Sequence, residues 1–139
     1  MEKMLNNVQR GLIEKIAQEY SLELVLLFGS RVSGRIRKDS DFDIAYLSRK
    51  NLDLTLESQM SVELAKLFKS ENIDLVNLKN AKPLIYYSIF NECQVIFEIN
   101  PMIFSALRVY SFKKYIENRF LYEEKFRRLQ KRLDNIKIQ

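Results

Sequence analysis

The sequence predicts an α/β (α+β) fold, in which helices pack on a small mixed β-sheet of about four strands. Two observations support this prediction. Short apolar runs bounded by turn residues alternate with longer segments whose apolar residues recur at helical spacing. From Asn100 to Ile136 the chain then reads as one long C-terminal helix, bent or broken near Asn118. At 139 residues, the chain is long enough to bury the core of a single domain.

The strands are predicted from the short apolar runs. The run ELVLLF ends directly at Gly29, which is typical of a buried strand. In the next run Phe42 and Ile44 alternate with Asp41 and Asp43, and a period of two indicates a strand with one buried face. The predicted strands are Glu23–Phe28, Asp41–Leu47, Ile73–Leu78 and Val95–Ile99.

The helices are predicted from apolar residues that lie three and four positions apart. Val8, Leu12 and Ile16 mark the first of them. Pro83 fits the first turn of a short helix, where its missing N–H costs no hydrogen bond, and Asn100 is expected to cap the long helix. The predicted helices are Lys3–Tyr20, Leu52–Phe68, Lys82–Asn91 and the long helix that starts at Pro101.

The composition excludes several classes of site. The chain has no histidine, which removes His-based triads, His metal sites and an imidazole general base. Cys93 is the only cysteine, so an internal disulfide is impossible. No apolar run approaches the roughly 20 residues that span a bilayer, and the N-terminus has no apolar signal region. We therefore expect a cytoplasmic protein.

The net charge of +5 is concentrated at the C-terminal end. Residues 108–139 hold ten Lys and Arg against four Asp and Glu, whereas the rest of the chain is close to neutral. A basic helix face can simply be solvated, or it can bind an acidic protein or a nucleic acid. An apolar stripe of Phe126, Leu129, Leu133 and Ile136 runs through this region and favours a protein partner.

Two aspartates open the second predicted strand. Asp41 and Asp43 are two residues apart, so they share one face of the strand. Neighbouring carboxylates repel each other unless a cation lies between them. Oxygen ligands suit a hard ion such as Mg²⁺, which completes its shell with water and substrate phosphates. The pair therefore predicts a magnesium site.

The turn after the first strand predicts a phosphate site. Gly29 allows the backbone to turn sharply and to approach a ligand closely. A short helix starting near Ser30 would offer free N–H groups and a positive dipole end to a phosphate. Arg31 and the other basic residues of the bend, Arg35, Arg37 and Lys38, add positive potential.

The spacing of these elements carries a family resemblance. Gly29-Ser30 is followed by ten residues and then by Asp41-Phe42-Asp43. This order resembles the G-S-x10-D-x-D signature of the polymerase-β-like nucleotidyltransferase superfamily. Members carry a third acidic residue on a neighbouring strand, and Asp74 matches it here. Among small members, the chain is most similar to the minimal nucleotidyltransferase (MNT) antitoxins, which are paired with HEPN-domain ribonuclease toxins.

The resemblance implies a function. It implies Mg²⁺-dependent transfer of AMP from ATP to a hydroxyl, expected to be a tyrosine of a HEPN-type toxin, which silences the toxin. Asp41, Asp43 and Asp74 would be the catalytic residues and the ligands of two Mg²⁺ ions. Gly29, Ser30 and Arg31 would bind the nucleotide. Residues 1–100 would form the nucleotidyltransferase domain, and residues 101–139 a helical extension of it that docks the partner.

Three alternatives stay open at the level of sequence. The chain could neutralise a toxin by binding and occlusion alone, with a vestigial site. It could transfer a nucleotide to a small molecule or an RNA, although known enzymes of that kind normally carry a further substrate-binding domain. The basic C-terminal helix could bind nucleic acid, in which case binding would weaken steeply with salt.

Overall fold

The computed structural model describes residues 5–33 and 42–138 of the chain. Its elements are α1 (Asn7–Glu19), β1 (Leu22–Phe28), α2 (Ser30–Ser33), β2 (Phe42–Ser48), α3 (Leu54–Phe68), β3 (Ile73–Asn77), α4 (Pro83–Asn91), β4 (Cys93–Glu98) and α5 (Ile103–Ile138). They form one mixed, four-stranded sheet with helices packed on it and a long C-terminal helix. The predicted fold class is confirmed.

The sheet has the strand order β3-β2-β1-β4. The central strand β1 runs antiparallel to both β2 and β4, whereas β3 runs parallel to β2. A parallel pair needs a crossover connection, and α3 supplies it between β2 and β3. This crossover brings the start of β3 next to the start of β2.

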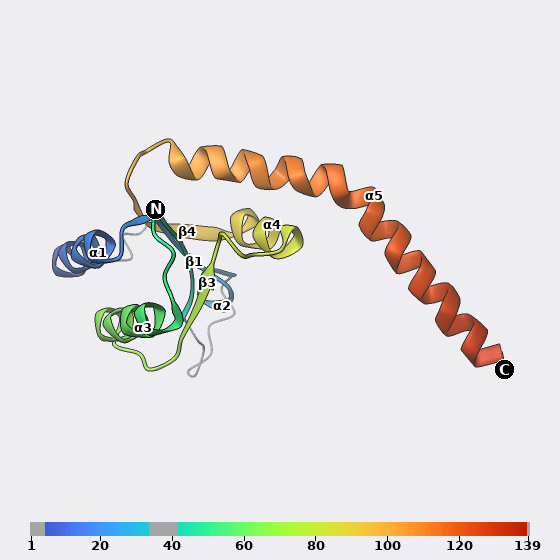
Figure 1. Cartoon of the computed structure of the whole chain (residues 1–139), viewed down its shortest axis with the longest axis horizontal. Coiled ribbons are helices and arrows are strands. Elements are labelled where there is room, and N and C mark those ends of the chain that lie inside the picture. The colour runs from blue at the N-terminus through green and yellow to red at the C-terminus, as the bar shows by residue number, and fades with distance from the viewer. Residues whose placement is uncertain (1–4, 34–41, 139) are drawn as a thin grey trace.

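Helices lie on both faces of the sheet (Figure 1), and each face carries its own core. On one face, α1 and α3 bury Ile13 and Leu64 against strand residues such as Ile44. On the other face, α4 buries Ile89 and Phe90, and the first turns of α5 pack beside them. Because β1 lies between both layers, residues 24–27 are fully buried.

Local sequence signals set several helix boundaries. α1 begins at Asn7 because Asn6 caps it: its side chain accepts a hydrogen bond from the Gln9 backbone N–H at 2.8 Å, and the Gln9 side chain accepts one in return. Asp53 caps α3 in the same way, through the Leu56 N–H at 2.8 Å. The predicted start of the first helix was too early, and residues 3 and 4 lie outside the described residues.

Other boundaries also differ from the prediction by one or two residues, and local contacts explain those of β4 and α5. β4 begins at Cys93, two residues before the predicted Val95, because Cys93 pairs with Phe28 of β1. α5 begins at Ile103, two residues after Pro101. The Asn100 side chain and carbonyl accept from the backbone N–H groups at 102 and 103, at 2.8 and 3.1 Å, and this turn delays the helix.

The long helix α5 changes direction part-way along its length (Figure 1). It is continuous from Ile103 to Ile138, so it is not broken near Asn118. The Asn118 side-chain amide donates to the carbonyl of Lys114 at 2.7 Å, a bond to the preceding turn that commonly bends helices.

Nowhere in residues 5–33 and 42–138 does a helix have both the length and the apolar character needed to cross a membrane.

Candidate active site

The fold brings two of the three predicted acidic residues together. Asp43 of β2 and Asp74 of β3 are direct partners in the parallel pairing of these strands. Parallel neighbours project to the same face, and adjacent strands lie roughly 4.8 Å apart. The two carboxylates therefore share one edge of the site, on the face of the sheet that α4 and α5 also cover.

Gly29 lies directly against the Asp43 side chain. Its φ is +81°, a left-handed conformation that favours glycine. A Cβ built at this position would lie 2.1 Å from the Asp43 Oδ2 and 2.9 Å from its Cγ, closer than any real contact. The glycine thus leaves the space that the Asp43 carboxylate occupies, which links the Gly-Ser turn to the aspartates physically.

The predicted short helix begins at Ser30. α2 spans only Ser30–Ser33, and its first turn is closed by the Val32 N–H donating to the Gly29 carbonyl at 3.1 Å. The turn holds Ser30 at the end of β1, next to the strand that carries Asp43. Gly29 is therefore placed beside Asp43, and Ser30 follows it as the first residue of α2. Nucleotide binding by these two residues stays a prediction.

Arg31, the third residue predicted to bind the nucleotide, contacts an aromatic ring of β2. Its guanidinium carbon lies 4.1 Å from the centre of the Phe42 ring, a cation–π contact. Phe42 alternates with Asp43 along β2 and packs in the core under α1 and α3, where it stacks on Phe68. The guanidinium thus contacts β2, the strand that carries Asp43, and nucleotide binding by Arg31 stays a prediction.

Asp41 and the basic residues Arg35, Arg37 and Lys38 lie outside the described residues. Within the described ranges, which omit Asp41, no group of three or more His, Cys, Asp or Glu side chains is gathered closely enough to hold a metal ion. Asp43 and Asp74 supply carboxylate oxygens, the ligand type that Mg²⁺ prefers. Asp41 follows the same alternation as Asp43 and would be the third ligand.

The row of residues across the sheet continues from Asp74 and Asp43 to Phe28 and Cys93. Burial raises the pKa of the Cys93 thiol to about 11, against a smaller opposing influence of Arg108. A thiol of this kind is protonated and unreactive at neutral pH. Cys93 packs against the core on this face of the sheet, and this environment agrees with a structural role.

Tyr46 contributes to the framework on the opposite face. Its hydroxyl donates a hydrogen bond to the Glu57 carboxylate of α3. Burial raises the pKa of Tyr46, and the Glu57 partner raises it further. The bond ties the crossover helix α3 to β2, the strand that carries Asp43.

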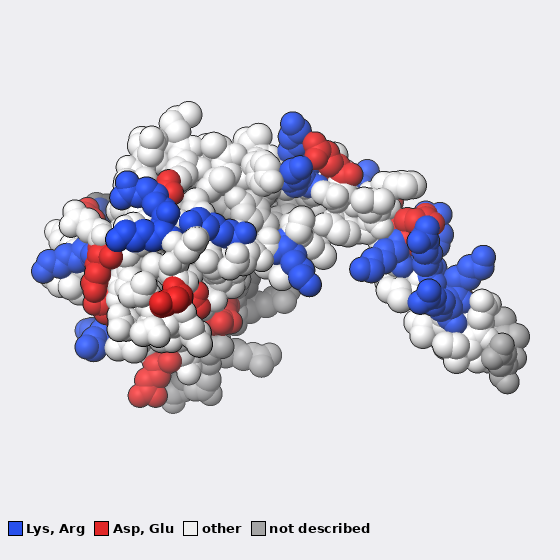
Figure 2. Space-filling model, in the orientation of Figure 1, with Lys and Arg blue, Asp and Glu red and all other residues white. Residues whose placement is uncertain are grey.

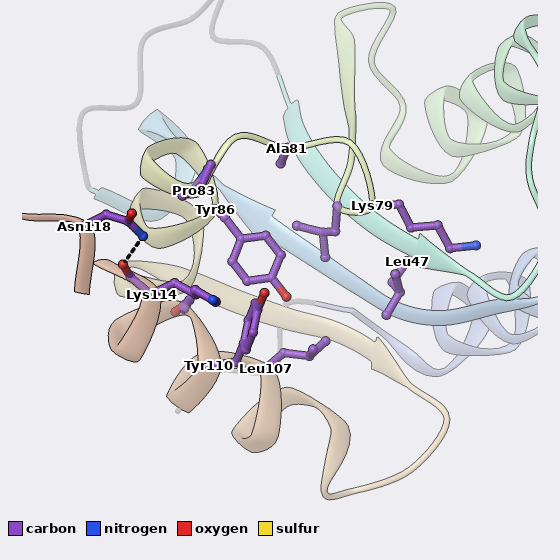
Figure 3. Close-up of a pocket in the computed structure, with 11 residues that line it drawn as sticks. Leu47, Lys79, Ala81, Pro83, Tyr86, Leu107, Tyr110, Lys114 and Asn118 are labelled. Atoms are coloured by element: carbon purple, nitrogen blue, oxygen red, sulfur yellow. Dashed lines mark hydrogen bonds between the residues drawn. The ribbon is translucent and has the colours of Figure 1, made fainter. Parts of the chain in front are cut away.

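A cavity of about 500 Å³ lies further along the same face (Figure 3). It is lined by residues that include Leu47, Leu78, Tyr86, Leu107, Tyr110 and Lys114. Leu47 is four residues beyond Asp43 on β2, so the cavity is remote from the acidic pair. Among its polar side chains, Lys79 donates to the Lys50 carbonyl at 3.4 Å and Asn118 donates to the carbonyl of Lys114. The sequence alone does not predict this cavity, because residues from several elements line it.

The model of the family described as Polymerase beta, Nucleotidyltransferase matches residues 12–102. The chain belongs to this family. The match includes Gly29, Ser30, Asp43 and Asp74, so the resemblance seen in the sequence is confirmed at the level of the family.

Individual relatives are also similar to the chain. The protein adenylyltransferase MntA of Shewanella oneidensis is 32% identical over 71 residues, which cover 51% of this chain and 50% of the relative. The MntA of Aphanizomenon flos-aquae is 30% identical over 86 residues, which cover 55% of this chain and 57% of the relative. The chain thus spans about half the length of the relatives that it matches.

Solved structures share the fold. A chain in the crystal structure of a toxin–antitoxin with AMP-PNP has a TM-score of 0.67 at 23% identity, and the match covers 84% of this chain and 98% of that one. A chain in the structure of a tri-AMPylated Shewanella oneidensis HEPN toxin in complex with MNT antitoxin has a TM-score of 0.62 at 21% identity, covering 86% and 97%. These likenesses extend the agreement in fold beyond residues 12–102.

Proposed function

We propose that this chain is an adenylyltransferase that moves AMP from ATP to a hydroxyl of a HEPN-type toxin and thereby acts as its antitoxin. The observation that carries the proposal is the register of Asp43 and Asp74, with Gly29 against the Asp43 carboxylate. The names of the relatives, protein adenylyltransferase MntA, support the same reaction. We expect the acceptor hydroxyl to be a tyrosine.

The acidic residues would hold the metal. Asp43 and Asp74 present carboxylate oxygens from adjacent strands, and Asp41 would add a third carboxylate. Bound Mg²⁺, expected as two ions, would neutralise charge on the triphosphate and on the reacting oxygens. Because all donors are oxygens, the site suits a hard divalent cation and not a soft one.

The residues of the chain would perform the transfer as follows. Gly29 and Ser30 hold the β- and γ-phosphates of ATP at the end of β1. The acceptor hydroxyl oxygen forms a bond to the α-phosphorus, while the bond from that phosphorus to the bridging oxygen of the β-phosphate breaks. Pyrophosphate leaves with the electron pair of that bond. Asp74 accepts the proton of the hydroxyl and passes it to solvent.

Intact-mass spectrometry tests this proposal. The product of the neighbouring open reading frame is co-expressed with this chain, or with its Asp43→Asn or Asp74→Asn variant. We expect an added AMP mass on the partner that requires both carboxylates. Asp53→Asn is the matched control, because asparagine caps a helix as well as aspartate does. A partner that gains AMP equally with the Asp43→Asn variant would contradict the proposed site.

The same experiment separates the alternatives. An unmodified partner that forms a stable complex with the chain would favour neutralisation by occlusion. Nucleotide transfer to an RNA or a small molecule, with the partner unmodified, would favour a different acceptor. The intact set of Gly29, Ser30, Asp43 and Asp74 supports catalysis over occlusion, because occlusion does not require these residues.

A further inference from the structure

The second half of α5, residues 119–138, extends away from the sheet (Figure 1). We propose that the apolar face of this distal α5 binds an amphipathic helix of the acceptor protein whose own apolar stripe is flanked by Asp and Glu. The inference rests on the proposed function and extends it, since it names the surface that holds the acceptor.

The apolar face of distal α5 has the spacing of a helix-pairing seam. Its residues are Tyr122, Phe126, Leu129, Leu133 and Ile136, which lie four, three, four and three positions apart. This alternation is the heptad pattern that pairs helices side by side. The side chains are exposed: Phe126 by 64%, Leu129 by 51%, Leu133 by 53% and Ile136 by 69%. A continuous exposed stripe of this kind marks an interaction site.

The start of α4 supplies a second wall beside this stripe. Two adjoining grooves lie between the helices, and both are lined by Leu84 of α4 and by Tyr122 and Phe126 of α5. Pro83 and Leu129 extend one of them. Leu84 is itself 52% exposed. A helix seated in this docking groove, formed by Leu84, Tyr122, Phe126 and Leu129, would contact two elements at once.

The stripe continues a face that already packs within the domain. In the first half of α5, Phe112 and Tyr115 pack on Tyr87 of α4, with ring centroids 5.5 and 3.9 Å apart. Tyr122 lies seven residues after Tyr115, two turns further along the same face of the helix. The distal stripe therefore offers an incoming helix the same kind of contact that α4 makes with the proximal half.

The charges beside the stripe select an acidic occupant. Residues 119–139 contain seven Lys and Arg against three Asp and Glu, and Figure 2 shows basic side chains gathered on this arm. Glu123 lies within 3.8 Å of Arg119, and Glu124 within 3.3 Å of Arg127, so these carboxylates are paired inside the helix. The partner must then carry acidic flanks to form ion pairs across the seam.

The same charges disfavour a second copy of this chain. Lys125 and Arg132 lie directly beside the apolar positions. Antiparallel self-pairing centred between Phe126 and Leu129 would set Lys125 against Arg132 of the other copy, and parallel self-pairing would set it against Gln130, so Lys125 gains no ion pair in either arrangement. The stripe also extends over only about two heptads, fewer than the three or four that a coiled coil usually needs.

Binding of two labelled peptides to the full chain tests the proposal. Both peptides have about four heptads with Leu at the apolar positions, and the flanking positions hold Glu in one and Lys in the other. By fluorescence anisotropy at low salt, we expect the Glu peptide to bind at least about tenfold more tightly than the Lys peptide. Phe126→Glu should weaken this binding by about tenfold or more, and Leu84→Glu should weaken it as well.

Phe120→Glu is the matched control. Phe120 is 67% exposed on the same helix, much like Phe126, but it lies outside the heptad positions. Its substitution should change binding by about twofold or less. Both variants keep an exposed position exposed, and circular dichroism verifies that each retains its helix.

Several outcomes would overturn the proposal. They are equal binding of both peptides, binding of neither, an equal loss with Phe120→Glu, or a dimer in sedimentation that Phe126→Glu dissociates. Binding of an RNA oligonucleotide in place of the Glu peptide would also overturn it. The assay needs no ATP, so its failure leaves the proposed transfer intact. Conversely, Glu-peptide binding without any AMP transfer in co-expression would remove the transfer and leave the docking groove.

Discussion

At the scale of single residues, Gly29 is the position with the least freedom. Its φ of +81° excludes a larger residue, and so does the Asp43 Oδ2, which would lie only 2.1 Å from a Cβ at this position. We expect Gly29→Ala to lower the free energy of unfolding by about 1–3 kcal/mol, because it adds backbone strain and displaces the Asp43 carboxylate. AMP transfer should be lost as well. Urea unfolding and the co-expression assay measure the two effects.

Gly11 provides the matched control for that substitution. It lies in α1, and nothing comes within 4 Å of a Cβ built there. Because alanine favours a helix over glycine, Gly11→Ala should raise the free energy of unfolding by about 0.5–1 kcal/mol and leave transfer unchanged. Equal effects of the two substitutions would contradict the special role assigned to Gly29.

Substitution of Asp74 should leave the stability of the fold intact while it weakens Mg²⁺ binding. It is exposed and is paired in register with Asp43, so two like charges lie side by side. Asp74→Asn removes one of them, and we expect the melting temperature to stay the same or to rise slightly. Millimolar Mg²⁺ should raise the melting temperature of the unsubstituted chain more than that of the variant. An ion stabilises the folded state by binding to it, and the variant has lost one of the carboxylates that would bind it. Thermal melts with and without Mg²⁺ measure this difference.

The Cys93 thiol gives a pH-dependent prediction. Since burial raises its pKa to about 11, the reactive thiolate should be scarce in the folded chain at pH 8. Alkylation by iodoacetamide at pH 8 should be on the order of 100-fold slower in the folded chain than in urea. The raised pKa also means that this group favours the folded state below the pKa of the unfolded thiol, and that this stabilisation is lost as the pH rises toward 11. Equal alkylation rates in both states would contradict the burial of this thiol.

At the scale of elements, an aromatic cluster around Tyr87 is one of the contacts that join α4 and α5. Tyr87 stacks on Tyr115 with ring centroids 3.9 Å apart and meets Phe112 edge to face. We expect Tyr87→Ala to lower the free energy of unfolding by about 2 kcal/mol, through lost burial and lost ring contacts. Tyr87→Phe keeps the ring and should cost less than about 0.5 kcal/mol. A large loss with both variants would assign the effect to the hydroxyl, contrary to this expectation.

The elements also show what a single sequence can predict. Apolar runs and helical spacing located the strands and the main helices, because both patterns arise from burial on one face. The motif spacing singled out Gly29, Asp43 and Asp74, and the fold sets Gly29 against the Asp43 carboxylate and Asp43 in register with Asp74. Strand ends were less predictable, since Cys93 enters β4 only through its pairing with Phe28, a contact between distant parts of the chain.

Exposure was the least predictable property. Val8 and Leu12 fit the helical stripe of the first helix, yet they are 73% and 43% exposed, whereas Ile13 and Ile16 are buried. The difference depends on how α1 lies on the sheet, which periodicity alone does not specify. The position of the Arg31 side chain was unpredictable for a similar reason. It lies over the ring of Phe42, and this contact depends on how the second strand packs beside the turn.

At the scale of the whole molecule, stability should be distributed unevenly along the chain. The strand β1 is hydrogen-bonded on both edges and buried on both faces, whereas distal α5 extends beyond the sheet with its apolar stripe exposed. Amide protection follows the number of tertiary contacts that opening must break. We therefore expect hydrogen exchange to be slowest in β1 and fast in residues 119–138, where only pairs such as Arg119 with Glu123 add local support.

Hydrogen–deuterium exchange with mass spectrometry measures this profile directly. Addition of the Glu-flanked peptide should slow exchange in residues 119–138 and leave β1 unchanged, because ordering would be confined to the helix that gains a partner. Phe126→Glu should abolish that protection and Phe120→Glu should preserve it. Strong protection of distal α5 in the isolated chain would instead mean that the stripe is already covered. In that case a second copy of the chain would have to bury the apolar stripe, despite the repulsion between Lys125 of one copy and Arg132 of the other.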